Sequence, residues 1–179
     1  SFGGLSKVHR ACGWRVGWMV LSGEATRIGD YHHALDLLGA LRLCANVPGQ
    51  YAIPAALEGI NTIGELTSEN GRLYESRRAA IEACSNSRHL SLVAPQGALY
   101  GFVGVTGELA EHFNDHQFAY DLMEQESVLV VPGSSFNVAY KNYFRITLLP
   151  EADVLREVFV RIDRLLERYA EKQKQREVA

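Results

Sequence analysis

The last predicted helix most constrains the fold, because its apolar side chains follow one face over most of its length. From about Glu151 onward, apolar residues recur three and four positions apart, the spacing of a single helix face. They are Val154, Leu155, Val158, Phe159, Ile162, Leu165, Leu166 and Tyr169. Such a face has to be buried against a second layer, and we expect that layer to be a small sheet.

Short apolar runs upstream of this helix supply the strands of that sheet. The turn Pro95-Gln96-Gly97 separates two of them and predicts a hairpin or a neighbouring pair. The predicted strands are 90–93, 98–103, 127–131 and 143–148, and a helix is predicted over 115–126. Residues 86–179 are therefore predicted to form a small α+β domain.

The residues before this domain are mostly helical in pattern. A short apolar run over 16–21 predicts a buried strand, and the sequence Asn46-Val47-Pro48-Gly49 predicts a helix break. Helices are predicted over 31–43, over 50–59 with Pro54 near the first turn, and over 66–84, the last being either one long helix or two joined ones. We expect residues 1–65 to be the C-terminal end of a preceding domain and residues 66–85 to be a helix that connects it to the α+β domain.

Composition and net charge indicate the general class of protein and which partners are not expected. An apolar fraction of 47% and a charged fraction of 22% are typical of a soluble globular protein. The net charge of −3 gives no reason to expect nucleic acid or an anionic membrane as a partner. Cys12, Cys44 and Cys84 form no Cys-x-x-Cys pair, so we expect buried reduced thiols in a cytoplasmic protein.

Lys7 is the first candidate for chemistry. It follows the small residues of Gly4-Leu5-Ser6. A lysine amine with a lowered pKa can form an imine with an aldehyde, and after release it can carry a proton. A solvated lysine is the more common interpretation of such spacing taken alone.

Arg15 stands between two glycines, Gly13 and Gly17, eight positions after Lys7. A guanidinium binds phosphate bidentately, and glycines allow close approach of the backbone. The alternative is an arginine on an ordinary turn. The segment is neither a P-loop nor a dinucleotide-binding fingerprint, since both glycine spacings are absent.

Arg145 lies within an apolar strand pattern and shares a strand face with Tyr143 and Thr147. A buried arginine needs an anionic partner. A substrate carboxylate and a structural Asp or Glu serve equally well, so both interpretations stay open.

Two histidine pairs are weaker candidates. His112 and His116 have helical i, i+4 spacing, but the His-Glu-x-x-His pattern is absent and Asn114-Asp115 predicts a helix cap between them. His32-His33 predicts a polar helix face. No metal site is expected.

These residues together resemble fold-type-I pyridoxal-phosphate aminotransferases. The Lys7 segment with Gly13-x-Arg15-x-Gly17 is similar to their cofactor-lysine region, 95–100 to their small-domain strand pair, and Phe144-Arg145-Ile146 to their carboxylate-binding strand. The stretches 42–48 and 71–75 are most similar to bacterial glutamate–pyruvate (alanine) aminotransferases. The resemblance covers essentially the whole chain.

The resemblance implies a role for each candidate. Lys7 would form the Schiff base with pyridoxal 5'-phosphate, Arg15 would hold its phosphate, and Arg145 would bind the substrate α-carboxylate. The loop 46–50 resembles one near a homodimer interface. One departure is Gly4, where many relatives have Ser or Thr as a phosphate ligand.

The same resemblance implies the C-terminal small domain of such a transferase, preceded by the tail end of its large α/β domain. The other active-site parts of the family precede the lysine, so we expect this portion alone to be inactive. Two alternatives remain: a noncatalytic domain, or another enzyme of this fold, such as an aspartate or aromatic aminotransferase or a C–S lyase.

Overall fold

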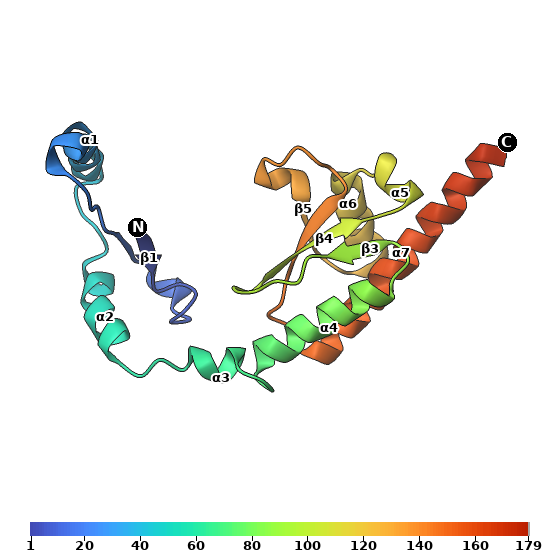
Figure 1. Cartoon of the computed structure of the whole chain (residues 1–179), viewed down its shortest axis with the longest axis horizontal. Helices are drawn as coiled ribbons and strands as arrows, with labels where there is room; N and C mark the ends of the chain where they lie inside the picture. The colour runs from blue at the N-terminus through green and yellow to red at the C-terminus, as the bar shows by residue number, and fades with distance from the viewer. Residues whose placement is uncertain (179) are drawn as a thin grey trace. The chain divides into compact units, whose positions relative to one another are not determined.

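The computed structural model describes residues 1–178, except for the side chains of Ala25 and of residues 176–178. The chain divides into two compact units, Ser1–Gly64 and Glu65–Ala179, which are described separately (Figure 1). Within the described residues, no helix is long and apolar enough to cross a membrane.

A four-stranded antiparallel sheet forms the centre of the second unit. Its strands are β3 (Leu90–Leu92), β4 (Tyr100–Val105), β5 (Val131–Pro132) and β6 (Tyr143–Thr147), in the order β3-β4-β6-β5. Strands β3 and β4 pair antiparallel around the predicted turn, which confirms the hairpin. In the β4–β6 pair, Phe102 lies opposite Arg145 and Val103 opposite Phe144.

Helices cover the buried face of this sheet. They are α4 (Arg72–Asn86), α6 (Asp115–Glu126) and α7 (Ala152–Val178), with the short α5 (Glu108–Glu111) before α6. Their apolar faces meet Val103, Val105, Phe144 and Ile146 of the sheet in one core. On α7 the innermost core side chains are Leu155, Phe159, Ile162, Leu165 and Leu166, which confirms the prediction of an apolar helix covering a sheet. Val154, predicted on the same face, is exposed, so the prediction was wrong at that position.

The opposite face of the sheet is only partly covered. Because side chains alternate along a strand, Tyr100, Phe102, Tyr143 and Arg145 all project from this second face. All four side chains are half-buried. The sheet thus has an apolar face that forms the core and an aromatic face that carries Arg145.

The predicted segment 66–84 forms two helices. The short α3 (Ile63–Thr67) ends before α4 begins at Arg72. The break needs Gly71, since a Cβ there would lie 2.6 Å from the carbonyl oxygens of Glu65 and Leu66. Helix α4 then packs along α7 (Figure 1), and Arg78 pairs with Glu75 on the same helix at 2.8 Å.

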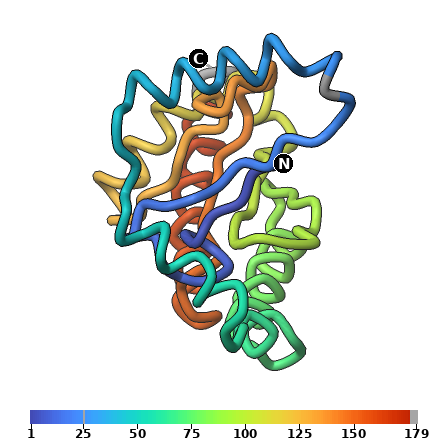
Figure 2. Tube along the Cα trace, turned by 90° about the vertical axis from the view of Figure 1, so that its left-hand side faces the viewer, coloured from blue at the N-terminus to red at the C-terminus, as the bar shows by residue number. Residues whose placement is uncertain are grey.

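The first unit begins with a small antiparallel hairpin. Strands β1 (Phe2–Gly4) and β2 (Gly17–Met19) run side by side, joined by a loop that contains the 3₁₀ turn η1 (Cys12–Trp14) (Figure 2). The prediction of a buried strand over 16–21 was wrong about burial. Met19 and Val20 are exposed on a described hairpin that has only two strands.

Two helices complete this unit, α1 (Ala25–Arg42) and α2 (Val47–Glu58). The predicted break at 46–49 was placed too late, because Pro48 lies in the first turn of α2 rather than before it. Proline is tolerated there, since the first N–H groups of a helix have no partner within the helix. Pro54, predicted near the helix start, is therefore inside α2.

The predicted strand over 127–131 is largely absent. Only Val131 and Pro132 pair with β6, opposite Arg145 and Phe144. Ser127 has the left-handed backbone conformation (φ 54°) that ends α6. Val128 and Val130 are buried while Leu129 is exposed, so the sequence shows strand-like alternation where no ladder forms. The alternation of apolar residues indicates which side chains are buried. Here Val128 and Val130 are buried although they form no pairs with β6.

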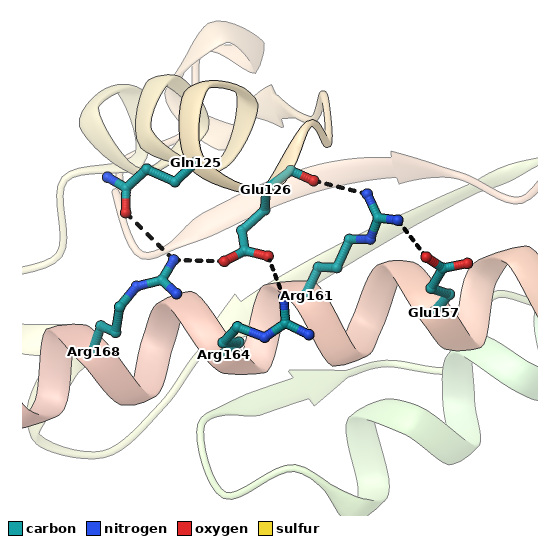
Figure 3. Close-up of polar contacts among 6 residues, drawn as sticks. All are labelled: Gln125, Glu126, Glu157, Arg161, Arg164 and Arg168. Atoms are coloured by element: carbon teal, nitrogen blue, oxygen red, sulfur yellow. Dashed lines mark hydrogen bonds and ion pairs between the residues drawn. The ribbon is translucent and has the colours of Figure 1, made fainter.

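Three arginines of α7 hold the carboxyl end of α6 (Figure 3). Glu126 is buried and accepts hydrogen bonds from Arg168 at 2.6 Å and Arg164 at 3.0 Å. Arg161 donates to the Glu126 carbonyl oxygen at 3.0 Å. The hydrogen bond from Arg168, with the charges of all three arginines, lowers the pKa of Glu126 against the opposing effect of burial.

We expect Glu126→Gln to destabilise the second unit by about 1.5–3 kcal/mol, because charge-assisted hydrogen bonds are lost. Since folding lowers the pKa of Glu126, its contribution is present above the ordinary value of 4.5 and disappears as the pH falls below it. Urea unfolding between pH 3 and pH 7 measures this (roughly the range over which a glutamate titrates). The difference in the free energy of unfolding between wild type and Glu126→Gln should become smaller as the pH falls.

The exposed neighbour Glu124 on the same helix is the matched control. Glu124→Gln should leave the free energy of unfolding nearly unchanged at every pH. Equal losses in the two variants would mean that the arginine cluster contributes nothing specific.

Candidate functional site

Lys7 and Arg15 lie on one loop, which connects β1 to β2. The loop is folded back on itself, with hydrogen bonds from Leu5 N to Val16 O (3.3 Å) and from Ala11 N to Leu5 O (3.1 Å). Leu5 is buried to 1% exposure and anchors the loop. Both candidate side chains are exposed, so the loop places an amine and a guanidinium at its surface.

Arg15 adopts the left-handed backbone conformation (φ 50°) as the residue that ends η1. This conformation is uncommon for a residue with a side chain. Its guanidinium donates to the carbonyl oxygen of Cys12 at 2.8 Å. A guanidinium carries five N–H donors, so this contact fixes the side chain and leaves donors for an anion.

The surroundings of the loop are positively charged. Residues 1–23 contain no Asp or Glu, although the chain as a whole carries a net charge of −3. The cationic side chains of this segment are Lys7, Arg10 and Arg15. The absence of carboxylates favours binding of an anionic group such as a phosphate.

Asn46, which sequence reasoning did not single out for this purpose, ties the loop to α2. Its side-chain oxygen accepts from Gly49 N at 3.1 Å and caps α2, while its amide nitrogen donates to the carbonyl oxygen of Trp14. Gly49 has no room for a side chain, because a Cβ would lie 2.8 Å from that amide nitrogen. An Asn before a helix predicts a cap, but only the fold shows which loop it holds.

Arg145 lies between two aromatic rings on the aromatic face of the sheet. Its guanidinium carbon is 4.5 Å from the centre of the Tyr100 ring and 4.7 Å from that of Phe136. Phe136 belongs to the 3₁₀ turn η2 (Gly133–Phe136). Among the residues that the structure describes, the ion pairs of Asp and Glu side chains with arginines do not include Arg145, and its anionic partner stays a prediction.

The structure brings Lys7 and Arg15 onto one loop of the first unit, while Arg145 belongs to the second unit. Phe136 was missed by sequence reasoning. Nine positions separate it from Arg145, and a turn and a loop intervene, so no strand or helix period links the two residues. The sequence signal near Phe136 was Pro132-Gly133, which predicts a tight turn but does not indicate which side chain Phe136 contacts.

The weaker candidates have structural explanations. Asn114 caps α6 by accepting from Gln117 N at 3.0 Å, which confirms the predicted cap between His112 and His116. His32 lies 4.0 Å from Asp36 on an exposed face of α1. In the part of the chain that the structure describes, no three His, Cys, Asp or Glu side chains are grouped as metal ligands.

The prediction of three buried thiols was wrong for two of them. Cys12 and Cys44 are exposed, while Cys84 is buried. Cys84 lies on the core face of α4, whereas Cys12 lies on the loop and Cys44 follows the last turn of α1. Burial and the nearby charge of Asp163 raise the pKa of the Cys84 thiol to about 12, so this thiol is unreactive at neutral pH.

The motifs and the fold define a member of a known enzyme family. The family model for class I and II aminotransferases matches residues 1–162, and the chain belongs to this family. The resemblance seen in the sequence motifs is thereby confirmed.

Individual relatives narrow the comparison. The chain is 40% identical over 169 residues to the glutamate–pyruvate aminotransferase AlaA of Escherichia coli K12, which covers 94% of this chain and 42% of that protein. It is 35% identical to an alanine aminotransferase of Mycobacterium tuberculosis, covering 94% of this chain and 39% of that protein. It therefore spans about two-fifths of the length of these relatives.

Solved structures give the same result. An aminotransferase from Escherichia coli superposes with a TM-score of 0.87 at 40% identity, over 93% of this chain and 41% of that one. An alanine aminotransferase from Pyrococcus furiosus superposes with a TM-score of 0.80 at 32% identity, over 93% of this chain and 42% of that one. The mixed helix and strand architecture is thus that of aminotransferases.

Proposed function

We propose that this chain is the C-terminal part of a pyridoxal-phosphate-dependent aminotransferase. The enzyme would move an amino group between alanine or glutamate and their 2-oxo acids. The family match supports the reaction class, and the names of the relatives in Escherichia coli and Pyrococcus furiosus support alanine and glutamate. In this proposal 1–65 is the end of the large domain, 66–85 the connecting helix and 86–179 the small domain.

The residues of the loop fit pyridoxal phosphate by their chemistry. Lys7 offers a primary amine for its aldehyde, and Arg15 offers a guanidinium for its phosphate on a segment without carboxylates. When bound, the cofactor supplies an electron sink that lets the α-carbon of an amino acid lose its proton. Cys12 O orients the Arg15 side chain, which keeps the phosphate end of the site in place.

Lys7 and Arg145 would act on the substrate. Once displaced by the substrate amine, the amine of Lys7 can accept and return a proton at the α-carbon. Arg145 would bind the α-carboxylate and so fix the orientation of that carbon. The observation that carries this role is that the guanidinium is half-buried between two rings, with no carboxylate partner among the described residues.

Homodimerisation and a cytoplasmic location complete the proposal. The first unit exposes many large apolar side chains, which favours burial against further protein surface. On α1 and α2 these are Tyr31, Leu37, Leu38, Leu41, Val47, Tyr51 and Leu57.

Labelling and turnover together test the function. The experiment uses the full-length protein, meaning the longer aminotransferase of which this chain is proposed to be the C-terminal part. Pyridoxal phosphate is added, its imine with lysine is reduced with borohydride, and the modified lysine is located by mass spectrometry. We expect stoichiometric labelling of Lys7. Amino transfer to 2-oxo acids is measured with alanine, glutamate, aspartate and aromatic amino acids, and alanine and glutamate should be preferred. Labelling spread over several lysines, or no transfer from any donor, contradicts the proposal.

A further inference from the structure

We propose that Phe136 and Tyr100 are positioning residues: they clamp the Arg145 guanidinium so that only its edge is presented to a ligand carboxylate. This inference rests on the proposed function, because it assumes that Arg145 binds the carboxylate of the substrate. It adds Tyr100 and Phe136 to the site, together with the contacts of the turn η2 that hold Phe136 in place.

The clamp is visible in the contacts of Arg145. The rings of Tyr100 and Phe136 lie 4.5 Å and 4.7 Å from the guanidinium carbon, one from β4 and one from η2. Phe136 also meets Phe102 edge-on, with ring centres 6.0 Å apart. Phe102 in turn stacks on Tyr143 at 5.2 Å. Phe136, Phe102 and Tyr143 therefore form one packed group, and Phe136 joins Tyr100 in contact with the guanidinium.

The turn η2 that carries Phe136 is attached to its neighbours on two sides. Gly133, the first residue of η2, lies so close to β6 that a Cβ would be 2.5 Å from the carbonyl oxygen of Tyr143. The buried carboxylate of Asp115 accepts from Ser134 N at 2.7 Å and from His116 N at 3.0 Å. Asp115 thus ties η2 to the start of α6. Asn137 then ends the turn in the left-handed conformation (φ 55°).

The electrostatics of the rings explain why the edge becomes the binding surface. The face of an aromatic ring is negative, so it attracts the guanidinium and repels a carboxylate. An anion can approach Arg145 only at the edge, where the N–H donors form a fork that matches a carboxylate. A side chain already held in its binding geometry also loses less conformational freedom when the ligand binds.

Binding of propionate to the full-length protein tests the clamp. Propionate has a carboxylate and no amino group, so its binding does not depend on turnover. We expect Phe136→Leu to raise the Kd for propionate by about 3- to 30-fold, the range of a partly desolvated cation–π contact. Phe136→Tyr should restore binding, because it returns the ring. In turnover with alanine, KM should rise while kcat stays nearly constant.

Tyr140→Leu is the matched control, because Tyr140 packs against Phe102 and Tyr143 whereas, among the described residues, the cation–π contacts of Arg145 are with Tyr100 and Phe136. It should leave the Kd unchanged. Equal Kd values for wild type and Phe136→Leu, equal rises in Phe136→Leu and Tyr140→Leu, or absent rescue by tyrosine would each overturn the clamp. Failure of the wild type to bind propionate would do so as well.

The two proposals fail in different ways. If the wild type binds propionate through the clamp but transfers no amino group, the proposed function is wrong and the clamp stands as a carboxylate site. If the wild type transfers amino groups while Phe136→Leu binds propionate normally, the clamp is wrong and the proposed function stands.

Discussion

Lys7→Ala in the full-length protein should abolish amino transfer and remove the visible absorption band that pyridoxal phosphate acquires on attachment to a lysine. Loss of the amine removes both the attachment point and the proton carrier. General acid–base catalysis alone accounts for about 10²- to 10⁴-fold in rate, so we expect a loss at or beyond that range. Absorption spectra and single-turnover rates with alanine measure the two effects separately.

Lys172→Ala is the control for this experiment. Lys172 is exposed on α7, far along the sequence from the loop, and no role in the site is assigned to it. This variant should keep the spectrum and the rate of the wild type. An unchanged spectrum in Lys7→Ala would contradict the assignment of Lys7, whatever the effect of the substitution on rate.

Phe118→Ala should destabilise the second unit by about 3–5 kcal/mol, the usual range for truncating a core phenylalanine. Phe118 is fully buried on α6. Its ring lies 5.1 Å from that of Phe113, 5.2 Å from that of Phe144 and 6.2 Å from that of Tyr169. Removing it opens a cavity between α6, the sheet and α7, which rigid neighbours cannot fill completely.

Urea unfolding followed by far-ultraviolet circular dichroism measures this loss. Tryptophan fluorescence is unsuitable, because Trp14 and Trp18 both lie in the first unit. Tyr120→Ala on the same helix is the control, since Tyr120 is 54% exposed and should cost little. A loss for Phe118→Ala no larger than for Tyr120→Ala would mean that the aromatic core around α6 is not the main source of stability.

Much of the second unit could be predicted because its signals are local. The predicted helix over 115–126 matches α6 at both ends, with Asn114 as the cap. The strand over 143–148 was predicted to within one residue. The strand over 127–131 failed because Val128 and Val130 are buried without a neighbouring strand to pair with. Sequence periodicity cannot distinguish these two situations.

The candidate site was predictable only in part. Lys7, Arg15 and Arg145 stand out because a cation among glycines or apolar residues is unusual, and their roles stay predictions. Asn46 and Phe136 did not stand out, since each acts through a partner distant in sequence or beyond a turn. Their contacts, with Trp14 O and with the Arg145 guanidinium, depend on the folded chain.

The sequence by itself determined the apolar face of α7, the existence of a sheet beneath it and the family to which the motifs point. These features follow from side-chain spacing along one element, which helix and strand geometry converts directly into faces. Only the tertiary structure showed that the Arg145 guanidinium contacts the rings of Tyr100 and Phe136, and that the buried Asp115 accepts a hydrogen bond from the turn that carries Phe136. Such contacts depend on which elements the core brings together, and spacing along the chain does not encode that.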